Sequence, residues 1–291
     1  MNPQSLARLE VFAAAVLFSI GGAGIKACAL TSWQVAGFRS GVAALTFLLF
    51  LPESRRGWTW RALLVGTTYA ATMLLFVLSN KLTTSANTIF LQSTAPLYIL
   101  LLGPWLLGER NRPSDLPVML MVAAGLSMFF IGAEAPVRTA PDPLRGNLLA
   151  VGSGLCWALT IMGMRWLGRD ESTRGSSAPA VVIGNLIALL VSLPWALPVV
   201  SARALDWTIV AGLGIVQIGL AYIFLTRALR HVAALQAMVL LLVEPALNPV
   251  WSWLIHGERP GRLSILGGAL ILGATGLKIW YDSRASGRAA A

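Results

Sequence analysis

Long apolar runs separated by short polar connections fill almost the whole chain. A helix that crosses a bilayer needs about 20 mostly apolar residues, and ten runs reach or approach that length. They cover residues 9–27, 33–52, 60–79, 85–107, 116–131, 147–167, 179–199, 207–226, 233–255 and 263–281. Regular alternation of apolar and polar residues is absent, which argues against a β-barrel. The pattern predicts an all-α integral membrane protein with ten transmembrane helices.

A short motif occurs twice, at the ends of the fourth and ninth runs. Glu109 of Gly108-Glu109-Arg110 follows Pro96 by 13 residues, and Glu258 of Gly257-Glu258-Arg259 follows Pro245 by the same 13. This duplication indicates an internal repeat, in which the first five runs correspond to the last five.

A second correspondence links the first and sixth runs. Phe18 and Lys26 match Trp157 and Arg165 in order and spacing. Because five is odd, two similar five-helix halves in series insert into the membrane in opposite orientations. Inverted repeats of this kind are typical of transporters, with the substrate site between the halves. We predict a first repeat over residues 1–134, a connection over 135–146, a second repeat over 147–291, and a central cavity.

Composition agrees with a membrane environment. The chain is 56% hydrophobic and only 12% charged, whereas soluble domains carry about 25% charged residues. The net charge of +10 lies in short loops, so it indicates topology rather than nucleic-acid binding. If the N-terminus is cytoplasmic, 14 Lys and Arg residues fall inside and 7 fall outside. The positive-inside rule then predicts that both termini are cytoplasmic.

Two prolines and one acid lie near the middle of the predicted helices. A mid-helix proline removes a backbone hydrogen bond, so Pro96 and Pro245 are predicted hinges that line or gate the cavity; the alternative is a kink that only aids packing. A carboxylate at that depth is costly. Our hypothesis is that Glu244 faces the pathway and binds a substrate amine or titrates during transport. The alternative is a group neutralised by a neighbouring helix.

Three basic residues within the runs receive a structural interpretation. Arg39 lies about two turns into the second run, where Gly37 and Gly41 form a helix-packing surface and a long side chain can extend outward. A structural role for Arg39 is favoured over a functional one. Lys26 and Arg165 fall at opposite membrane faces and are predicted to be anchors there.

Several function classes lack their signatures. The sequence contains no P-loop, no Gly-x-Ser-x-Gly or paired-Asp protease motif, and no cluster of residues at metal-ligand spacing. Cys28 and Cys156 form neither a disulfide framework nor a metal cluster. We therefore expect no enzyme, no cofactor and no metal.

The duplicated motifs resemble the drug/metabolite transporter superfamily, in its EamA-type ten-helix branch, over roughly residues 9–281. The chain is similar to bacterial amino-acid exporters of the YddG type. The resemblance implies that helices 1, 3, 4, 6, 8 and 9 surround a central cavity, with helices 5 and 10 packed to one side. The cavity residues that it implies are Phe18, Tyr69, Met73, Gln92, Tyr98, Trp157, Gln217, Tyr222 and Glu244.

The inverted repeat and the predicted cavity favour a transporter, and the resemblance implies a secondary transporter in a bacterial inner membrane. We expect it to export small metabolites by alternating access, most simply amino acids, including aromatic or other neutral ones. Transport of nucleotide sugars, organic cations or drugs is one alternative, and a membrane-embedded lipid enzyme or a channel is another. The expected partners are the lipid bilayer and a small-molecule substrate, without nucleic acid. A monomer is expected, and a homodimer stays open.

Overall fold

The structure is a computed structural model, and it describes residues 3–108, 113, 115–131, 135–168, 177–228, 231, 237 and 240–289. Helices account for nearly all of these residues, and the only β-pairing among them is an isolated bridge between Val137 and Ala140. Eight described helical segments are long and apolar enough to cross a membrane, and the fifth predicted run forms a shorter apolar helix. The predicted all-α membrane fold is confirmed.

The first half of the chain forms five membrane segments, two of which are interrupted. The first segment is split at Ile20 and the fourth at Ser93 and Thr94. The helices are α1 (Pro3–Ser19), α2 (Gly21–Ala27), α3 (Ser32–Phe50), α4 (Trp60–Leu82), α5 (Ser85–Gln92), α6 (Ala95–Leu106) and α7 (Asp115–Ile131), with the 3-10 helix η1 (Pro52–Arg55) between α3 and α4.

The second half repeats this plan. Its helices are α8 (Pro143–Gly168), α9 (Ala178–Ala196), α10 (Ala204–Gly212), α11 (Ala221–Ala228), α13 (Val243–His256) and α14 (Arg262–Ala289), and the π-helical segment η3 (Leu213–Leu220) joins α10 to α11. Part of the ninth predicted run, over 233–255, lies outside the described residues, and α13 covers its second part. Helix α8 begins at Pro143, inside the predicted connection over 135–146.

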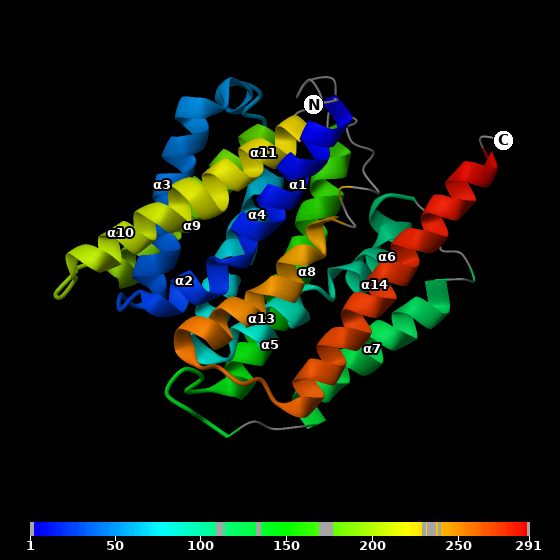
Figure 1. The fold of residues 1–291 in the computed structure, drawn as a ribbon. Coiled ribbons are helices and arrows are strands. Elements are labelled where there is room, and N and C mark those ends of the chain that lie inside the picture. The colour runs from blue at the N-terminus through cyan, green and yellow to red at the C-terminus, as the bar shows by residue number, and fades with distance from the viewer. Residues whose placement is uncertain are drawn as a thin grey trace.

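The contacts between the two halves come in matched pairs: each contact recurs when both helices are replaced by their equivalents in the other half. Helix α4 packs on α8 as α1 packs on α11, and α5 and α6 pack on α8 as α13 packs on α1. The pairs α3–α9, α5–α13 and α7–α14 join equivalent segments of the two halves. This pattern is the one that a pseudo-two-fold axis between inverted repeats produces. Both chain ends lie on the same side of the bundle (Figure 1).

The two repeated Gly-x-Arg corners share one backbone conformation where it is described. Gly108 and Gly257 each have a φ of 67°, the left-handed region that favours glycine at a helix C-terminus. A glycine in this conformation therefore follows both helices: Gly257 is the C-cap residue of α13, and Gly108 comes one residue after Leu107, the C-cap residue of α6. Glu109 and Arg110, which complete the first corner, lie outside the described residues.

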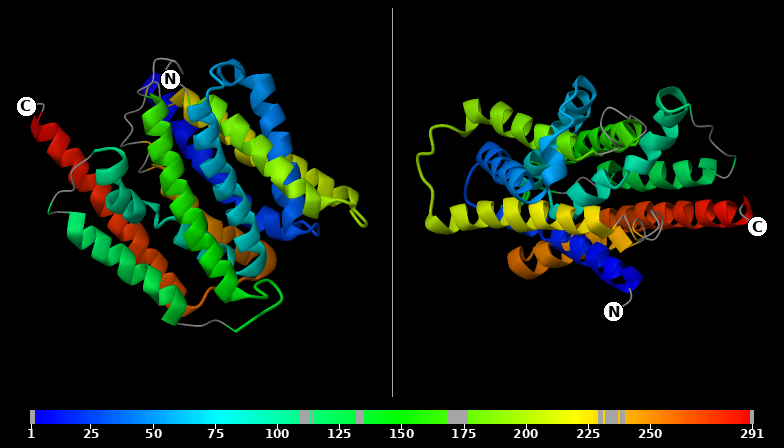
Figure 2. Two further views of the ribbon diagram at one scale, coloured as in Figure 1. Left: turned by 180° about the vertical axis from the view of Figure 1, so that it is seen from behind. Right: turned by 90° about the horizontal axis from the view of Figure 1, so that it is seen from above.

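Helices α7 and α14 form a pair at one side of the bundle (Figures 1 and 2). Their backbones approach closely at two glycines, since a Cβ added to Gly267 would lie 2.6 Å from the carbonyl oxygen of Gly125. Lys278 and Asp115 add an ion pair of 2.6 Å between the same two helices. Small residues at a close crossing are a common means of packing transmembrane helices.

We expect Gly267→Ala to destabilise the protein, because the added methyl group meets backbone atoms that cannot rotate away. Overpacking of this kind costs about 1–3 kcal/mol. Gly273→Ala on the same helix is the matched control, since no atom lies within 4 Å of its added Cβ. The measurement is the fraction of detergent-purified protein that stays soluble after heating. Equal losses in the two variants would contradict the close crossing.

Candidate functional site

A cavity of about 1490 Å³ lies between the two halves. Residues of α1, α4, α5, α6, α8, η3, α11 and α13 line it, as the resemblance implies, and residues of α3, α9 and α14 contribute as well. The cavity reaches the surface at the connection from α3 to α4, because its lining includes the exposed residues Glu53, Arg55 and Arg56. This connection and the N-terminal end of α1 lie on the same side of the bundle (Figure 1). The cavity is therefore accessible from one face of the bundle.

An aromatic cluster forms part of the cavity lining. The ring of Tyr222 lies 5.2 Å from Phe18, 5.8 Å from Phe47 and 6.3 Å from Tyr69, in each case edge to face. Met73 and Trp157 pack against the same cluster. Edge-to-face rings pack tightly and stabilise one another beyond the area that they bury. The cluster gives the cavity a rigid apolar surface contributed by both halves.

Interrupted helices surround the cavity. The fourth segment breaks immediately before Pro96, which lies in the first turn of α6, and Pro245 lies in the first turn of α13. The first segment breaks after Ser19, and the eighth widens into the π-helical η3. Inside a bilayer, irregular backbone is tolerated only where protein or a water-filled cavity satisfies the freed polar groups. The breaks therefore place the backbone polar groups that they free around the cavity.

Two amide side chains connect helices at this level. Gln92 donates a hydrogen bond of 2.8 Å from Nε2 to Ser153 Oγ, which in turn donates to the carbonyl of Thr72. Gln217 donates from Nε2 to the carbonyl of Phe18 at 3.4 Å, next to the break between α1 and α2. Both amides join one half of the protein to the other.

The structure brings most of the predicted cavity residues together. Those that line the cavity are Phe18, Tyr69, Met73, Gln92, Trp157, Gln217, Tyr222 and Glu244, together with the two predicted hinges Pro96 and Pro245. Tyr98 is half-buried on α6 and is not among the lining residues. A role in binding stays a prediction for each of them.

Glu244 carries the acidic group of this set. Its side chain is half-buried and lines the cavity from the first turn of α13. Among the residues that the structure describes, no basic group lies within ion-pair distance of its carboxylate. The alternative of neutralisation by a neighbouring helix thus has no support within that part of the chain.

Arg39 departs from its sequence interpretation. Its side chain does not extend outward: it is 1% exposed and lines the cavity. Gly37 and Gly41 pack on α9 as a packing surface should, against Ser192 and Leu189. Two residues along a helix correspond to about 200° of rotation, so Arg39 faces the opposite way. An ionisable residue within a membrane segment is a functional candidate by default, so the sequence already marked Arg39 for attention.

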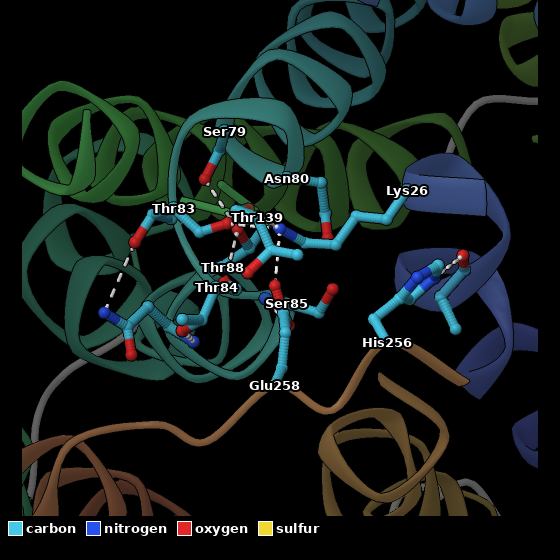
Figure 3. A network of polar contacts seen from close by, with 12 residues as sticks. Lys26, Ser79, Asn80, Thr83, Thr84, Ser85, Thr88, Thr139, His256 and Glu258 are labelled. Carbon is cyan, nitrogen blue, oxygen red and sulfur yellow. Dashed lines mark hydrogen bonds and ion pairs between the residues drawn. The ribbon is translucent and has the colours of Figure 1, made fainter. Parts of the chain in front are cut away.

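A buried ion pair lies at the end of the bundle opposite the chain ends, where α2 meets the connection from α13 to α14 (Figures 1 and 3). Lys26 Nζ lies 2.6 Å from Glu258 Oε1, and the two side chains are 5% and 2% exposed. Lys26 comes from the first half and Glu258 from the repeated corner of the second. The prediction that Lys26 is an anchor at the membrane surface was wrong, because its charge is paired inside the protein.

Backbone groups complete this cluster. Lys26 also donates to the carbonyl of Thr83 at 2.8 Å and to that of Thr139. The other oxygen of Glu258 accepts from the backbone N–H of Ser85 at 3.0 Å, in the first turn of α5. A buried ion pair is stable only when hydrogen bonds satisfy its remaining donors and acceptors. We call Lys26, Thr83, Ser85, Thr139 and Glu258 the closing cluster.

A cysteine lies beside the closing cluster. Cys28 is 1% exposed, and Lys81 donates to its carbonyl oxygen at 2.6 Å. Burial raises the pKa of the Cys28 thiol above its ordinary value. A protonated, buried thiol reacts slowly with electrophiles, so Cys28 can report whether this face opens.

Comparison with known proteins identifies relatives over nearly the whole chain. The model of the EamA-like transporter family matches residues 6–131 and 144–279. The pseudopaline exporter CntI from two strains of Pseudomonas aeruginosa is 26% identical over 268 residues, which cover 89% of this chain and 90% of that protein. A protein of known crystal structure, 20% identical, covers 96% of this chain with a TM-score of 0.62, and 98% of its own chain is matched. That likeness shows the fold alone.

We expect Lys26→Met or Glu258→Gln to open the closed face. Removing one partner of a buried ion pair leaves the other uncompensated, at a cost of about 3–5 kcal/mol. In a Cys156→Ser background, where Cys28 is the remaining thiol, a polar maleimide should label Cys28 faster in either variant than in the parent protein.

The double variant Lys26→Met/Glu258→Gln controls for general unfolding. Because it leaves no buried charge unpaired, it should be more stable than either single variant. Labelling of Cys28 that stays at the parent rate in both single variants would show that the ion pair does not hold this face closed.

Proposed function

This chain belongs to the EamA-like transporter family, and we propose that it exports small metabolites, most simply amino acids, across a bacterial inner membrane. Family membership makes it a multi-pass secondary transporter rather than a lipid enzyme. The proposal concerns its substrate, its direction and its orientation in the membrane.

The observation that carries the proposal is a cavity open at one face and closed at the other. The open face carries the exposed residues Arg55 and Arg56, and the closed face holds the buried Lys26–Glu258 pair. With the 14 to 7 bias of basic residues, the open face is the cytoplasmic one. The structure then corresponds to an inward-open state, in which an exporter loads its substrate.

The cavity lining supports an amino acid as the substrate. The aromatic cluster around Tyr222 offers ring edges and faces to an apolar side chain. Glu244 offers a carboxylate without an ion-pair partner in the described part of the chain, which suits a substrate amine. Ligand sites commonly combine such an apolar lining with a few placed polar groups.

A larger metabolite is the second candidate. The cavity volume of about 1490 Å³ exceeds the roughly 300–1,000 Å³ of ordinary ligand pockets. A relative that is 26% identical is named a pseudopaline exporter. Nucleotide sugars and organic cations are further candidates, so competition experiments should include them.

We expect the purified protein in liposomes to catalyse counterflow of a neutral amino acid. Liposomes loaded with unlabelled phenylalanine should accumulate external labelled phenylalanine transiently, because one carrier exchanges the two pools. Empty liposomes are the control, and a panel of other labelled amino acids and metabolites defines selectivity. Uptake equal to the control across the whole panel would refute amino-acid transport, and flux that does not saturate would indicate a channel.

Glu244→Gln should weaken amino-acid binding by roughly tenfold or more, because a hydrogen bond to a charged group contributes about 1.5–3 kcal/mol. Glu10→Gln is the matched control, since Glu10 lies on α1 outside the cavity lining. The measurement is the concentration of unlabelled amino acid that halves counterflow, on either side of neutral pH. An unchanged value at every pH would remove Glu244 from the site.

A further inference from the structure

We propose that Arg39 binds a carboxylate of the transported substrate, so that the cavity selects molecules with a carboxylate and an amine together. This inference rests on the proposed transport function and names the chemistry of its binding site. Sequence patterns favoured a structural role for Arg39, and four observations oppose that role.

The first observation is the depth of the side chain. Arg39 is the eighth residue of α3, about 10.5 Å from the first residue of that helix at 1.5 Å per residue. It therefore lies well inside the hydrocarbon region, whichever face is cytoplasmic. A charged side chain at such a depth is costly, and that cost requires a compensating interaction or a function.

The second observation is the shortage of partners. Arg39 donates to Gln217 Oε1 at 3.5 Å and to the Met73 carbonyl at 3.4 Å, both long for hydrogen bonds, and to the weak acceptor Met73 Sδ at 3.8 Å. Its Nε is buried without a partner, and no carboxylate lies within ion-pair distance among the described residues. A guanidinium has five N–H donors in a planar arrangement that fits a carboxylate. Much of this donor capacity is unused.

The third observation is a contrast with the cations that lie inside or partly inside the protein. Lys26 is paired with Glu258 and Lys278 with Asp115, each at 2.6 Å, and Lys81 donates to the Cys28 carbonyl at 2.6 Å. The chain thus supplies each of these lysines with a short polar contact. Arg39 is more deeply buried than Lys26 or Lys278, and it has neither a carboxylate partner nor a short hydrogen bond in the part of the chain that the structure describes. The missing anion is best supplied by the ligand.

The fourth observation is the position of Arg39 in the cavity. It shares the lining with the aromatic cluster and with Glu244, which comes from the opposite half. A positive group from one repeat and a negative group from the other match the two charges of an amino acid. Gln217 contacts both Arg39 and the Phe18 carbonyl, which places the cation beside the break between α1 and α2.

This arrangement also gives a reason for selectivity. An empty carrier that closes must bury an unpaired guanidinium and an unpaired carboxylate, and burying unpaired charges is expensive. A bound zwitterion neutralises both groups before closure. An analogue without its carboxylate leaves Arg39 unpaired, so it both binds weakly and opposes the closing step.

Four phenyl compounds separate these contributions: phenylalanine, phenylalaninamide, 2-phenylethylamine and 3-phenylpropanoate. Binding to the full-length purified protein is followed by ligand-dependent thermal stabilisation. The variants are Arg39→Met, Arg39→Lys and Glu244→Gln. Arg145→Met is the control for loss of a positive charge, since the Arg145 side chain is 80% exposed and outside the cavity lining.

We expect the parent protein and Arg145→Met to prefer phenylalanine over its amide by roughly 10- to 100-fold, as a charge-assisted hydrogen bond predicts. Arg39→Met should lose that preference, Arg39→Lys should retain part of it, and Glu244→Gln should retain it in full. Arg39→Lys also guards against misfolding of the uncharged variant, and size-exclusion chromatography checks both.

The inference would be overturned if Arg39→Met kept the preference for phenylalanine over phenylalaninamide. It would also be overturned if the parent protein bound none of the four compounds, or if it bound phenylalaninamide as tightly as phenylalanine. Failure of the amino-acid proposal looks different. If 3-phenylpropanoate binds in an Arg39-dependent manner while phenylalanine is neither bound nor exchanged, the carboxylate site stands and the amino-acid substrate does not.

Discussion

The lack of water in the bilayer interior constrains every feature of this protein. Backbone and side-chain polar groups must find partners within the chain or in a water-filled space. Over most of the described helices, regular backbone hydrogen bonds meet this demand. The exceptions gather around the central cavity, where the first and fourth segments break and the eighth becomes π-helical. Polar groups that the helices release there have access to water or to a ligand.

The same constraint explains how the two ends of the pathway differ. At the closed face, the charges of Lys26 and Glu258 satisfy each other and three backbone groups, two from the first half and one from the connection between the halves. At the open face, cationic side chains such as Arg56 are exposed. Opening the closed face must hydrate the ion pair, because a separated pair left dry would be far less stable. The present conformation and one in which this face is open therefore differ in where water enters the protein.

Sequence patterns predicted the fold well, because membrane helices are defined by length and hydrophobicity and the repeat is marked by spaced residues such as Pro96 and Pro245. Helix ends were less accurate, since α1 and α8 extend into polar sequence at their N-termini. A hydropathy pattern ends where lipid contact ends, whereas backbone hydrogen bonding continues beyond it. The fifth apolar run also predicted the membrane segment that forms the shorter helix α7.

The site was partly predictable, for a definite reason. Repeat-matched aromatic residues such as Phe18 and Trp157 were singled out by position, and the structure places both on the cavity lining. The pairing of Lys26 with Glu258 was not accessible, because it joins residues 232 positions apart in different repeats. The orientation of Arg39 depended on which face of α3 meets α9. Gly37 and Gly41 indicated one packing face, but the face opposite a packing surface can meet lipid, protein or a cavity.

Gln217 connects the cavity lining to a break in the first membrane segment. Its amide oxygen contacts Arg39 and its amide nitrogen contacts the Phe18 carbonyl, immediately before the helix break at Ile20. The first segment continues as α2 to Ala27, and the last turn of α2 holds Lys26 of the closing cluster. One segment thus carries a cavity residue, a break and a closing residue in succession. The polar contacts at the cavity and the closing cluster are therefore joined by one short, continuous membrane segment.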